Sequence, residues 1–140
     1  MIIINKRAKF NYNLYDRVEA GISLLGREAK SVRERRADLS NSFAKIINNE
    51  AFLINANIPA DPGGNYNSTR TRKLLLHKSE IVSILSKMKA KKLTLVPTKL
   101  YTKGRLVKVE LALAKTKKEF EKKEAIKKKD IEREIEKELR

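Results

Sequence analysis

Two alternating stretches near the end of the chain determine the predicted fold: Leu93-Thr-Leu-Val-Pro-Thr-Lys-Leu-Tyr101 and Leu106-Val-Lys-Val-Glu-Leu-Ala-Leu113. Apolar side chains recur at about every second position in both stretches, which is typical of strands that bury one face. Lys103-Gly104 lies between them and supplies the residue types of a tight turn. The sequence therefore predicts an antiparallel hairpin over residues 93–113.

Upstream of this hairpin, short runs of the same kind alternate with turn residues. The spacing of apolar residues predicts one strand from Phe10 to Gly26 and a second hairpin with strands over residues 39–47 and 51–58. The residues Asn48-Asn49-Glu50 are predicted to form its turn. Residues 59–67, rich in Pro, Gly and Asn, are predicted to form a loop.

Two segments have the spacing of helices. Apolar residues three or four apart predict a short helix over residues 27–36 and another between Lys78 and Lys91, with Ser79 and Glu80 at its start. Several short strands with two short helices favour a mainly β fold. The predicted architecture is a small antiparallel barrel of the oligonucleotide-binding (OB) type, flanked by helices.

The chain is strongly basic, with 33 Lys and Arg against 17 Asp and Glu and a formal charge of +16. Residues 1–114 hold 22 basic and 9 acidic side chains, whereas residues 115–140 hold 11 and 8. The excess positive charge therefore belongs to the predicted barrel domain, 1–114, and indicates a polyanionic partner such as nucleic acid. The tail, 115–140, lacks Gly and Pro and is expected to be disordered or a fraying helix until it meets a partner.

Several classes of protein are disfavoured. The absence of cysteine excludes disulfides and Cys-ligated zinc and agrees with a reducing cytoplasm. The apolar run at residues 2–4 is too short for a signal peptide or a membrane span, so we expect a cytoplasmic protein without a membrane partner. His77 is the one histidine, and no nucleophile or ligand cluster accompanies it in the sequence. We therefore expect no enzyme activity, no catalytic residues, no metal and no cofactor.

The block Arg70-Thr-Arg-Lys-Leu-Leu-Leu-His-Lys78 joins a basic run to an apolar triplet at a helix start. Six further blocks follow one another along the chain: Asn5-Lys-Arg-Ala-Lys9, Glu19-Ala-Gly-Ile22, Gly26-Arg-Glu-Ala-Lys-Ser-Val-Arg33, Glu50-Ala-Phe-Leu53, Leu93-Thr-Leu-Val-Pro97 and Lys108-Val-Glu-Leu-Ala-Leu-Ala-Lys115. Together the seven blocks resemble the small protein B family, which partners transfer-messenger RNA (tmRNA) in rescuing stalled bacterial ribosomes. The resemblance implies an OB-related barrel and a tail that becomes helical on the ribosome.

The resemblance also implies which residues bind RNA and the ribosome. On the body, the implied RNA-binding residues are Asn5, Lys6, Arg7, Tyr12, Glu19, Arg72, Lys73, Leu75, His77 and Lys78. In the tail, the implied ribosome-binding residues are Lys117, Lys118, Glu121, Lys122 and Lys123, after a junction where Thr116 replaces the family's usual glycine.

Some of these residues also have a structural interpretation. Two of the three leucines in the triplet are expected to be core. For Glu19, RNA recognition and a structural ion pair remain equal alternatives. Glu28 is expected to be structural.

The function implied is that of an adaptor. It binds the transfer-RNA-like domain of tmRNA and brings it to the empty A site of a stalled ribosome, while the tail passes the decoding centre and senses the vacant message channel of the small subunit. Elongation factor Tu with charged tmRNA is an implied further partner. Composition alone equally permits a constitutive ribosomal protein or a generic oligonucleotide-binding barrel protein, and a nucleic-acid enzyme is the third alternative.

Overall fold

The predicted C-terminal hairpin is the centre of the fold. A computed structural model describes residues 1–61 and 64–138, and in it β6 (Thr94–Lys103) pairs with β7 (Leu106–Thr116) along their whole length, from Thr94 opposite Ala114 to Lys103 opposite Leu106. Gly104 takes a left-handed conformation, φ +62°, at the turn, which glycine adopts without steric cost. The predicted hairpin is confirmed.

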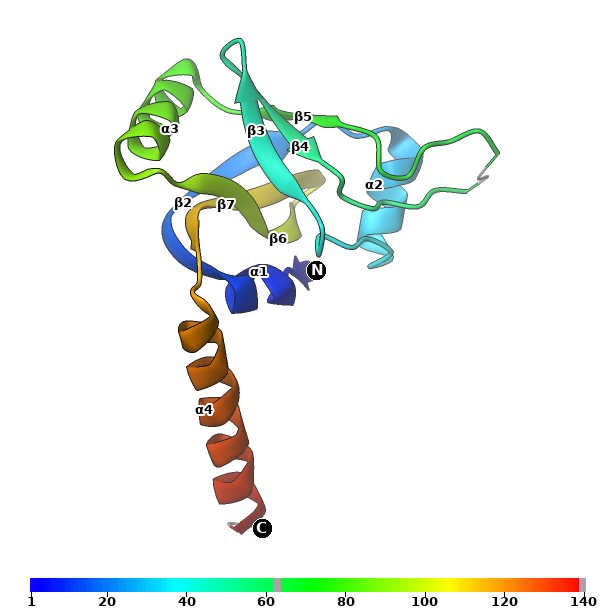
Figure 1. The fold of residues 1–140 in the computed structure, drawn as a ribbon. Coiled ribbons are helices and arrows are strands. Elements are labelled where there is room, and N and C mark those ends of the chain that lie inside the picture. The colour runs from blue at the N-terminus through cyan, green and yellow to red at the C-terminus, as the bar shows by residue number, and fades with distance from the viewer. Residues whose placement is uncertain (62–63, 139–140) are drawn as a thin grey trace.

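The strands close into a barrel (Figure 1). Within the described residues, the sheet runs in the order β1-β6-β3-β4-β5-β2-β7, and the additional pairing of β6 with β7 completes the ring. All of the strand pairs are antiparallel. This confirms the predicted mainly β, OB-like barrel with short helices. The other strands are β1 (Ile2–Ile4), β2 (Tyr12–Ile22), β3 (Phe43–Ile47), β4 (Glu50–Ile54) and β5 (Arg72–Leu75).

The core fills the inside of the barrel. Along each strand, every second side chain points into the barrel. The larger buried apolar side chains come from most of the strands and from the segment just before the long loop that begins at residue 59. They include Leu53, Ile58, Leu95, Leu100, Val109 and Leu111, each 0% exposed. One continuous apolar cluster therefore holds the sheet closed.

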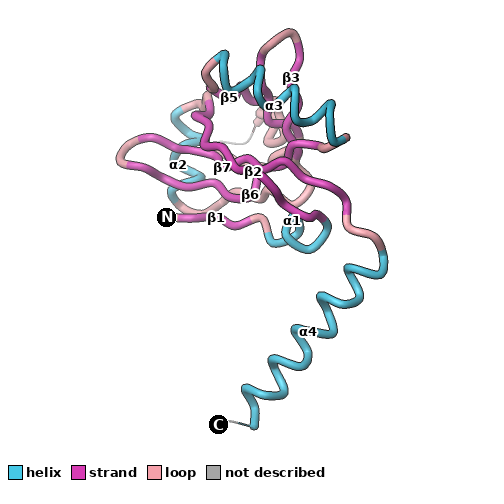
Figure 2. The backbone as a smooth tube through the Cα atoms, turned by 90° about the vertical axis from the view of Figure 1, so that its left-hand side faces the viewer, coloured by secondary structure: helices cyan, strands magenta, loops and turns pink. Residues whose placement is uncertain are grey.

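Four helices flank the barrel in the described part of the chain: α1 (Lys6–Asn11), α2 (Gly26–Arg33), α3 (Lys78–Lys91) and α4 (Glu119–Glu138). In Figure 1, α2 and α3 lie on opposite sides of the barrel and α1 lies below it. The tail helix α4 projects away from the barrel in both views (Figures 1 and 2). None of the helices in these residues is long and apolar enough to cross a membrane.

The predicted elements differ from the observed ones mainly at their ends. The first strand does not start at Phe10, because the side chain of Asn5 caps α1 and residues 6–11 are helical. The helix α2 is shorter than predicted, with Glu34 as its C-cap. The predicted second hairpin is present with shorter strands, and Asn48 and Asn49, with φ of 50° and 62°, form its two-residue turn.

Strands β1 and β5 were not predicted. Each is only three or four residues long, too short for an alternating pattern to stand out. The predicted loop over residues 59–67 contains no helix or strand in its described part, and its positions 62 and 63 lie outside the described residues. The predicted domain boundary after Ala114 lies within β7, which continues to Thr116.

Candidate nucleic-acid interface

An exposed leucine marks the candidate interface. Leu75 is 55% exposed, whereas Leu74 is 2% exposed and Leu76 packs against the core. In β5, alternation points Arg72 and Leu74 into the barrel and Lys73 and Leu75 outward. Two of the three leucines are therefore core, as predicted, and the third presents its side chain to solvent.

A groove surrounds Leu75 on the outer face of the sheet. It has a volume of about 740 Å³, and the end of β5, the start of α3 and the β3–β4 turn contribute to its walls. Its lining combines apolar side chains, Leu75 and Ile81 among them, with lysines, amide groups and the carboxylate of Glu50. Apolar and cationic groups together suit an RNA surface. Eight of the lining residues are called the Leu75 surface below: Gly21, Asn48, Asn49, Lys73, Leu75, His77, Lys78 and Lys108.

Gly21 makes room for the exposed leucine. It lies opposite Leu75 in the β2–β5 pair, and a Cβ at Gly21 would stand only 3.2 Å from the Leu75 Cβ. A contact of this length is tighter than about nine in ten of those that real Cβ atoms make. The glycine thus lets β5 approach closely while Leu75 stands on the outer face.

His77 lies where the Leu75 surface meets α3. It is the N-cap of the helix, and its backbone N–H donates to Glu80 Oε1 at 2.9 Å. Helix α3 therefore starts at Lys78, one residue earlier than the predicted Ser79. The His77 side chain is exposed.

Glu19 adjoins this surface, two residues before Gly21 on the same face of β2. Its carboxylate accepts a hydrogen bond from the Tyr101 hydroxyl, and Lys103 Nζ lies 3.5 Å away. The Tyr101 hydrogen bond is the largest influence on its pKa, which lies below the ordinary value. The side chain is still 39% exposed. The structure thus provides the ion pair, while one edge of the carboxylate remains accessible.

Sequence reasoning did not single out Tyr101. Its place in the alternating pattern of β6 gives no sign that it reaches Glu19, 82 residues away along the chain. We expect Tyr101→Phe to raise the pKa of Glu19 toward its ordinary value and to weaken RNA binding by about threefold to tenfold, the usual effect of one lost hydrogen bond. An NMR titration of the Glu19 carboxyl and a binding curve at fixed salt measure both effects.

Lys103→Gln is the comparison for this prediction. It removes the more distant partner and leaves the Tyr101 hydrogen bond in place, so the pKa of Glu19 should move less than in Tyr101→Phe. An unchanged Glu19 pKa in Tyr101→Phe would show that the hydroxyl does not hold the carboxylate.

Two predicted RNA contacts, Asn5 and Arg72, have buried side chains. Asn5 is 4% exposed and donates to the carbonyl oxygens of Leu39 and Pro97 at 3.1 and 2.9 Å, while its Oδ1 accepts from Ala8 N. Arg72 is 0% exposed. Both side chains bind within the protein, so we correct their assignment to a structural one.

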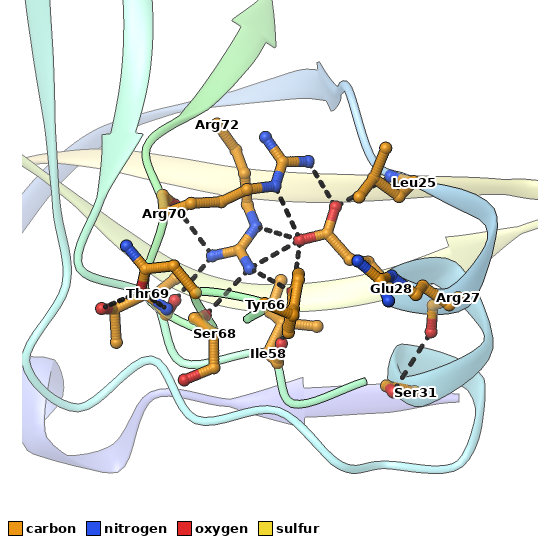
Figure 3. Close-up of polar contacts among 12 residues, drawn as sticks. Leu25, Arg27, Glu28, Ser31, Ile58, Tyr66, Ser68, Thr69, Arg70 and Arg72 are labelled. Carbon is orange, nitrogen blue, oxygen red and sulfur yellow. Dashed lines mark hydrogen bonds and ion pairs between the residues drawn. The ribbon is translucent and has the colours of Figure 1, made fainter. Parts of the chain in front are cut away.

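Arg72 belongs to a polar network centred on Glu28 (Figure 3). Glu28 Oε2 accepts from Arg72 Nη2 at 2.7 Å, from Arg70 Nε at 3.0 Å and from the Tyr66 hydroxyl at 2.6 Å. Its Oε1 accepts from Leu25 N at 2.8 Å and from Arg70 Nη2. The predicted structural role of Glu28 is confirmed, because the network ties α2 to β5 and to the long loop.

This environment determines the ionisation of Glu28. Burial acts to raise its pKa, but the hydrogen bonds from Arg70, Tyr66, Leu25 and Arg72 outweigh burial and lower the pKa from 4.5 to about 2. Arg72 also donates to backbone carbonyl oxygens, at 2.7 Å to Ala56 and 2.9 Å to Ser68. A buried charge pair with nearly all of its hydrogen bonds made is stable as a unit and costly to break.

The other RNA-binding residues predicted on the barrel domain lie at a second surface, beside α1. Lys6 and Arg7 are exposed, and Arg7 Nη1 donates to Asn41 Oδ1 at 2.9 Å. Tyr12 is half-buried against the small cluster that includes Ala8. A groove of about 360 Å³ there is lined by Arg7, Tyr12 and Asn41, among others. The predicted RNA-binding residues are therefore divided between two surfaces.

The predicted tail residues are divided as well. Lys117 attaches the tail to the body, since its backbone N–H donates to Asn11 O at 2.9 Å and its Nζ donates to Lys9 O at 3.2 Å. Glu121 Oε2 accepts from Asn13 Nδ2 at 2.7 Å. By contrast, Lys118 and Lys123 are exposed and Lys122 is half-buried.

The fold and these surfaces define a class of small basic OB-like barrel proteins with a charged C-terminal helix. Comparison with known proteins identifies the family, because the family model described as "SmpB protein" matches residues 2–140. The chain belongs to the SmpB family, and the resemblance noted from its sequence blocks is confirmed.

Individual relatives agree with this assignment. The SsrA-binding protein of Thermosipho africanus (strain TCF52B) is 48% identical over 139 residues, which cover 96% of this chain and 93% of the relative. That of Mesoplasma florum is 49% identical over 137 residues, 95% of this chain and 92% of the relative. A solved chain described as "tmRNA-SmpB: a journey to the center of the bacterial ribosome" is 40% identical, with a TM-score of 0.70 over 89% of this chain and 94% of that one.

Proposed function

We propose that the protein is an RNA-binding adaptor that recognises the transfer-RNA-like domain of tmRNA with the Leu75 surface. It brings this RNA to the empty A site of stalled ribosomes, where α4 passes the decoding centre and enters the vacant message channel. Elongation factor Tu accompanies the charged RNA. The protein acts in the cytoplasm by binding alone, and the ribosome carries out peptide transfer.

The observation that carries this proposal is the exposure of Leu75 within a cationic groove. A solvent-exposed leucine that lies close to Gly21 and is flanked by Lys73, His77 and Lys78 suits packing against an unstacked base or a ribose. The lysines supply the phosphate contacts, which position the RNA and make its affinity dependent on salt. The tmRNA-binding relatives support the identity of the RNA.

The membership of Lys6, Arg7, Tyr12 and the exposed tail lysines in the interface is also part of this proposal. Their separation from the Leu75 surface fits an adaptor that meets two RNA molecules. No group of three or more His, Cys, Asp or Glu side chains that could hold a metal ion occurs in the described residues.

Competition binding tests the proposal. At one near-physiological salt concentration, the transfer-RNA-like domain of tmRNA competes with ordinary transfer RNA and with a generic duplex for the full-length protein. We expect the protein to bind the transfer-RNA-like domain of tmRNA clearly more tightly than the other two RNAs. Equal binding to all three would leave a generic basic barrel protein, and retention on washed ribosomal subunits without tmRNA would favour a constitutive ribosomal protein.

Leu75→Ala should weaken binding to the transfer-RNA-like domain by about tenfold to a hundredfold, because a leucine buried on the RNA contributes roughly 1.5 to 3 kcal/mol. The free energy of unfolding should change little, since the side chain is 55% exposed in the free protein. Titration calorimetry and urea denaturation measure the two quantities.

Leu74→Ala is the matched control for Leu75→Ala. It makes the same chemical change one position away, on the buried face of β5. We expect it to cost about 2 to 5 kcal/mol of stability and to leave RNA affinity near wild type at temperatures where the variant is folded. Wild-type RNA affinity in Leu75→Ala would exclude the Leu75 surface as the interface.

A further inference from the structure

A further groove lies at the other end of α3. It has a volume of about 390 Å³ and is lined by Tyr15, Asp16, Lys87, Lys91, Leu93, Leu113 and Lys115, which we call the Tyr15 groove. Lys78, at the start of α3, lines the Leu75 surface, whereas Lys87 and Lys91 are near the end of the helix. A helix of 14 residues is about 20 Å long. The two grooves are therefore separate.

A β-bulge creates the Tyr15 groove. In the β2–β7 pair, Leu14 lies opposite Ala114 and Arg17 opposite Ala112, so Tyr15 and Asp16 together face the single residue Leu113. Bulges of this kind turn side chains away from the regular alternation of a strand. Tyr15 is accordingly 48% exposed, although an aromatic residue in a barrel strand would ordinarily pack against a neighbour.

The rim of the groove is cationic. Its lining includes three lysines and one carboxylate, that of Asp16. This carboxylate already forms an ion pair with Lys87 Nζ at 3.0 Å. Lys91 and Lys115 are exposed and come from different elements, α3 and β7. The negative end of the α3 dipole explains a lysine at position 91, but it explains neither Lys115 nor the exposed Tyr15 ring.

This arrangement fits an unpaired nucleotide. An exposed aromatic ring in a groove that also has apolar lining provides a stacking face for a base, and lysines from two elements can neutralise the adjoining phosphates. Leu93 and Leu113 supply the apolar lining. Every base has a stacking face, so such a site tolerates many sequences.

We propose that the Tyr15 groove binds an unpaired nucleotide of ribosomal RNA, at a contact distinct from the Leu75 surface. This inference rests on the proposed function. Ribosomal RNA is the partner because Lys115 precedes the start of α4 at Glu119 by only four residues. The RNA that surrounds α4 on the ribosome then also lies beside the groove, whereas the transfer-RNA-like domain occupies the other end of α3.

Two assays with the full-length protein test this inference. One measures binding of the protein to the transfer-RNA-like domain, and the other measures binding of the protein–tmRNA complex to ribosomes stalled on truncated messages. Tyr15→Ala should weaken ribosome binding by about fivefold to a hundredfold, the effect of losing one stacked base. It should leave binding to the transfer-RNA-like domain unchanged. Tyr15→Phe keeps the stacking face and should behave as wild type in both assays.

Charge variants provide a second test that does not depend on Tyr15. Lys91→Gln with Lys115→Gln should reduce the salt dependence of ribosome binding by about one to two units of its logarithmic slope. Asp16→Asn removes the one carboxylate and should keep or strengthen binding. Lys30→Gln, on α2 at the opposite side of the barrel, removes one positive charge away from the groove and is the control for each single lysine substitution (Figure 1).

Unchanged ribosome binding in Tyr15→Ala and in the double lysine variant would overturn the inference while leaving the proposed function intact. An equal loss in both assays would also overturn it, because the groove would then serve the transfer-RNA-like domain. If instead the wild type showed no preference for that domain in the competition experiment, the proposed function itself would fail.

Discussion

Glu28→Gln should lower the free energy of unfolding by about 3 to 5 kcal/mol, the cost of removing one partner from a buried ion pair. The variant keeps the shape of the side chain but leaves the Arg72 guanidinium, 0% exposed, without its counter-charge. Arg70 loses the same partner. Urea denaturation measures the change, and α2 and the long loop should lose amide-exchange protection before the rest of the barrel.

Glu34→Gln is the control for this prediction. Glu34 makes the same kind of contact at the end of the same helix, with Arg36 at 3.7 Å, but its side chain is 46% exposed and that of Arg36 is 40% exposed. We expect a change within about 0.5 kcal/mol. A loss of less than 1 kcal/mol in Glu28→Gln would show that the network contributes little to stability.

Lowering the pH should reproduce the loss of stability that Glu28→Gln causes. The pKa of Glu28 is about 2 in the folded protein against an ordinary value of 4.5, so the folded state binds fewer protons than the unfolded chain between these values. The stabilisation is complete above about pH 4.5 and is lost as the pH falls toward 2, in total about 3 kcal/mol. Glu28→Gln should lack this part of the pH dependence, which a comparison of denaturation curves at pH 5 and pH 2.5 would reveal.

The Glu28 network also shows what a sequence can and cannot predict. Alternation predicted the β6–β7 hairpin and the barrel class, because side chains two apart share a face whatever their partners are. The family resemblance of the block over residues 70–78 placed Arg72 among the RNA contacts, whereas its side chain is buried in the Glu28 network. Whether a side chain in this block points into the barrel or out to solvent depends on β5, a strand of four residues that no sequence pattern predicted.

Contacts between distant residues account for the other differences. The side chain of Asn5 caps α1 and also donates a hydrogen bond to the carbonyl oxygen of Pro97, which is 92 residues away along the chain. Tyr101 reaches Glu19 only because β6, β7 and β2 are neighbours in the closed sheet. In contrast, the prediction that two of the three leucines are core was correct, because Leu74 is 2% exposed and Leu76 packs against the core.

Removal of α4 by truncation after Lys118 should abolish ribosome rescue while leaving binding to the transfer-RNA-like domain within about twofold of wild type. Residues 119–140 contain eight Lys or Arg and eight Asp or Glu, so their removal does not alter the net charge that attracts RNA. This cut preserves β7 to Thr116 and the hydrogen bond from Lys117 N to Asn11 O. Binding isotherms and a tagging assay on stalled ribosomes measure the two effects.

A proline in the middle of α4 tests whether the helix, and not only its charge, is required. Lys127→Pro disfavours the helix by about 3 kcal/mol, whereas Lys127→Ala removes the same charge and favours it. Phe120, Ile126 and Ile131 are exposed apolar side chains on α4, and only a continuous helix holds them in fixed positions among the charged residues. Rescue should therefore fall at least tenfold in Lys127→Pro and stay near wild type in Lys127→Ala, about 1.4 kcal/mol of difference on the ribosome. Equal rescue by the two variants would mean that the tail acts as a flexible charged segment, because neither the helix nor the register of its apolar side chains would then matter.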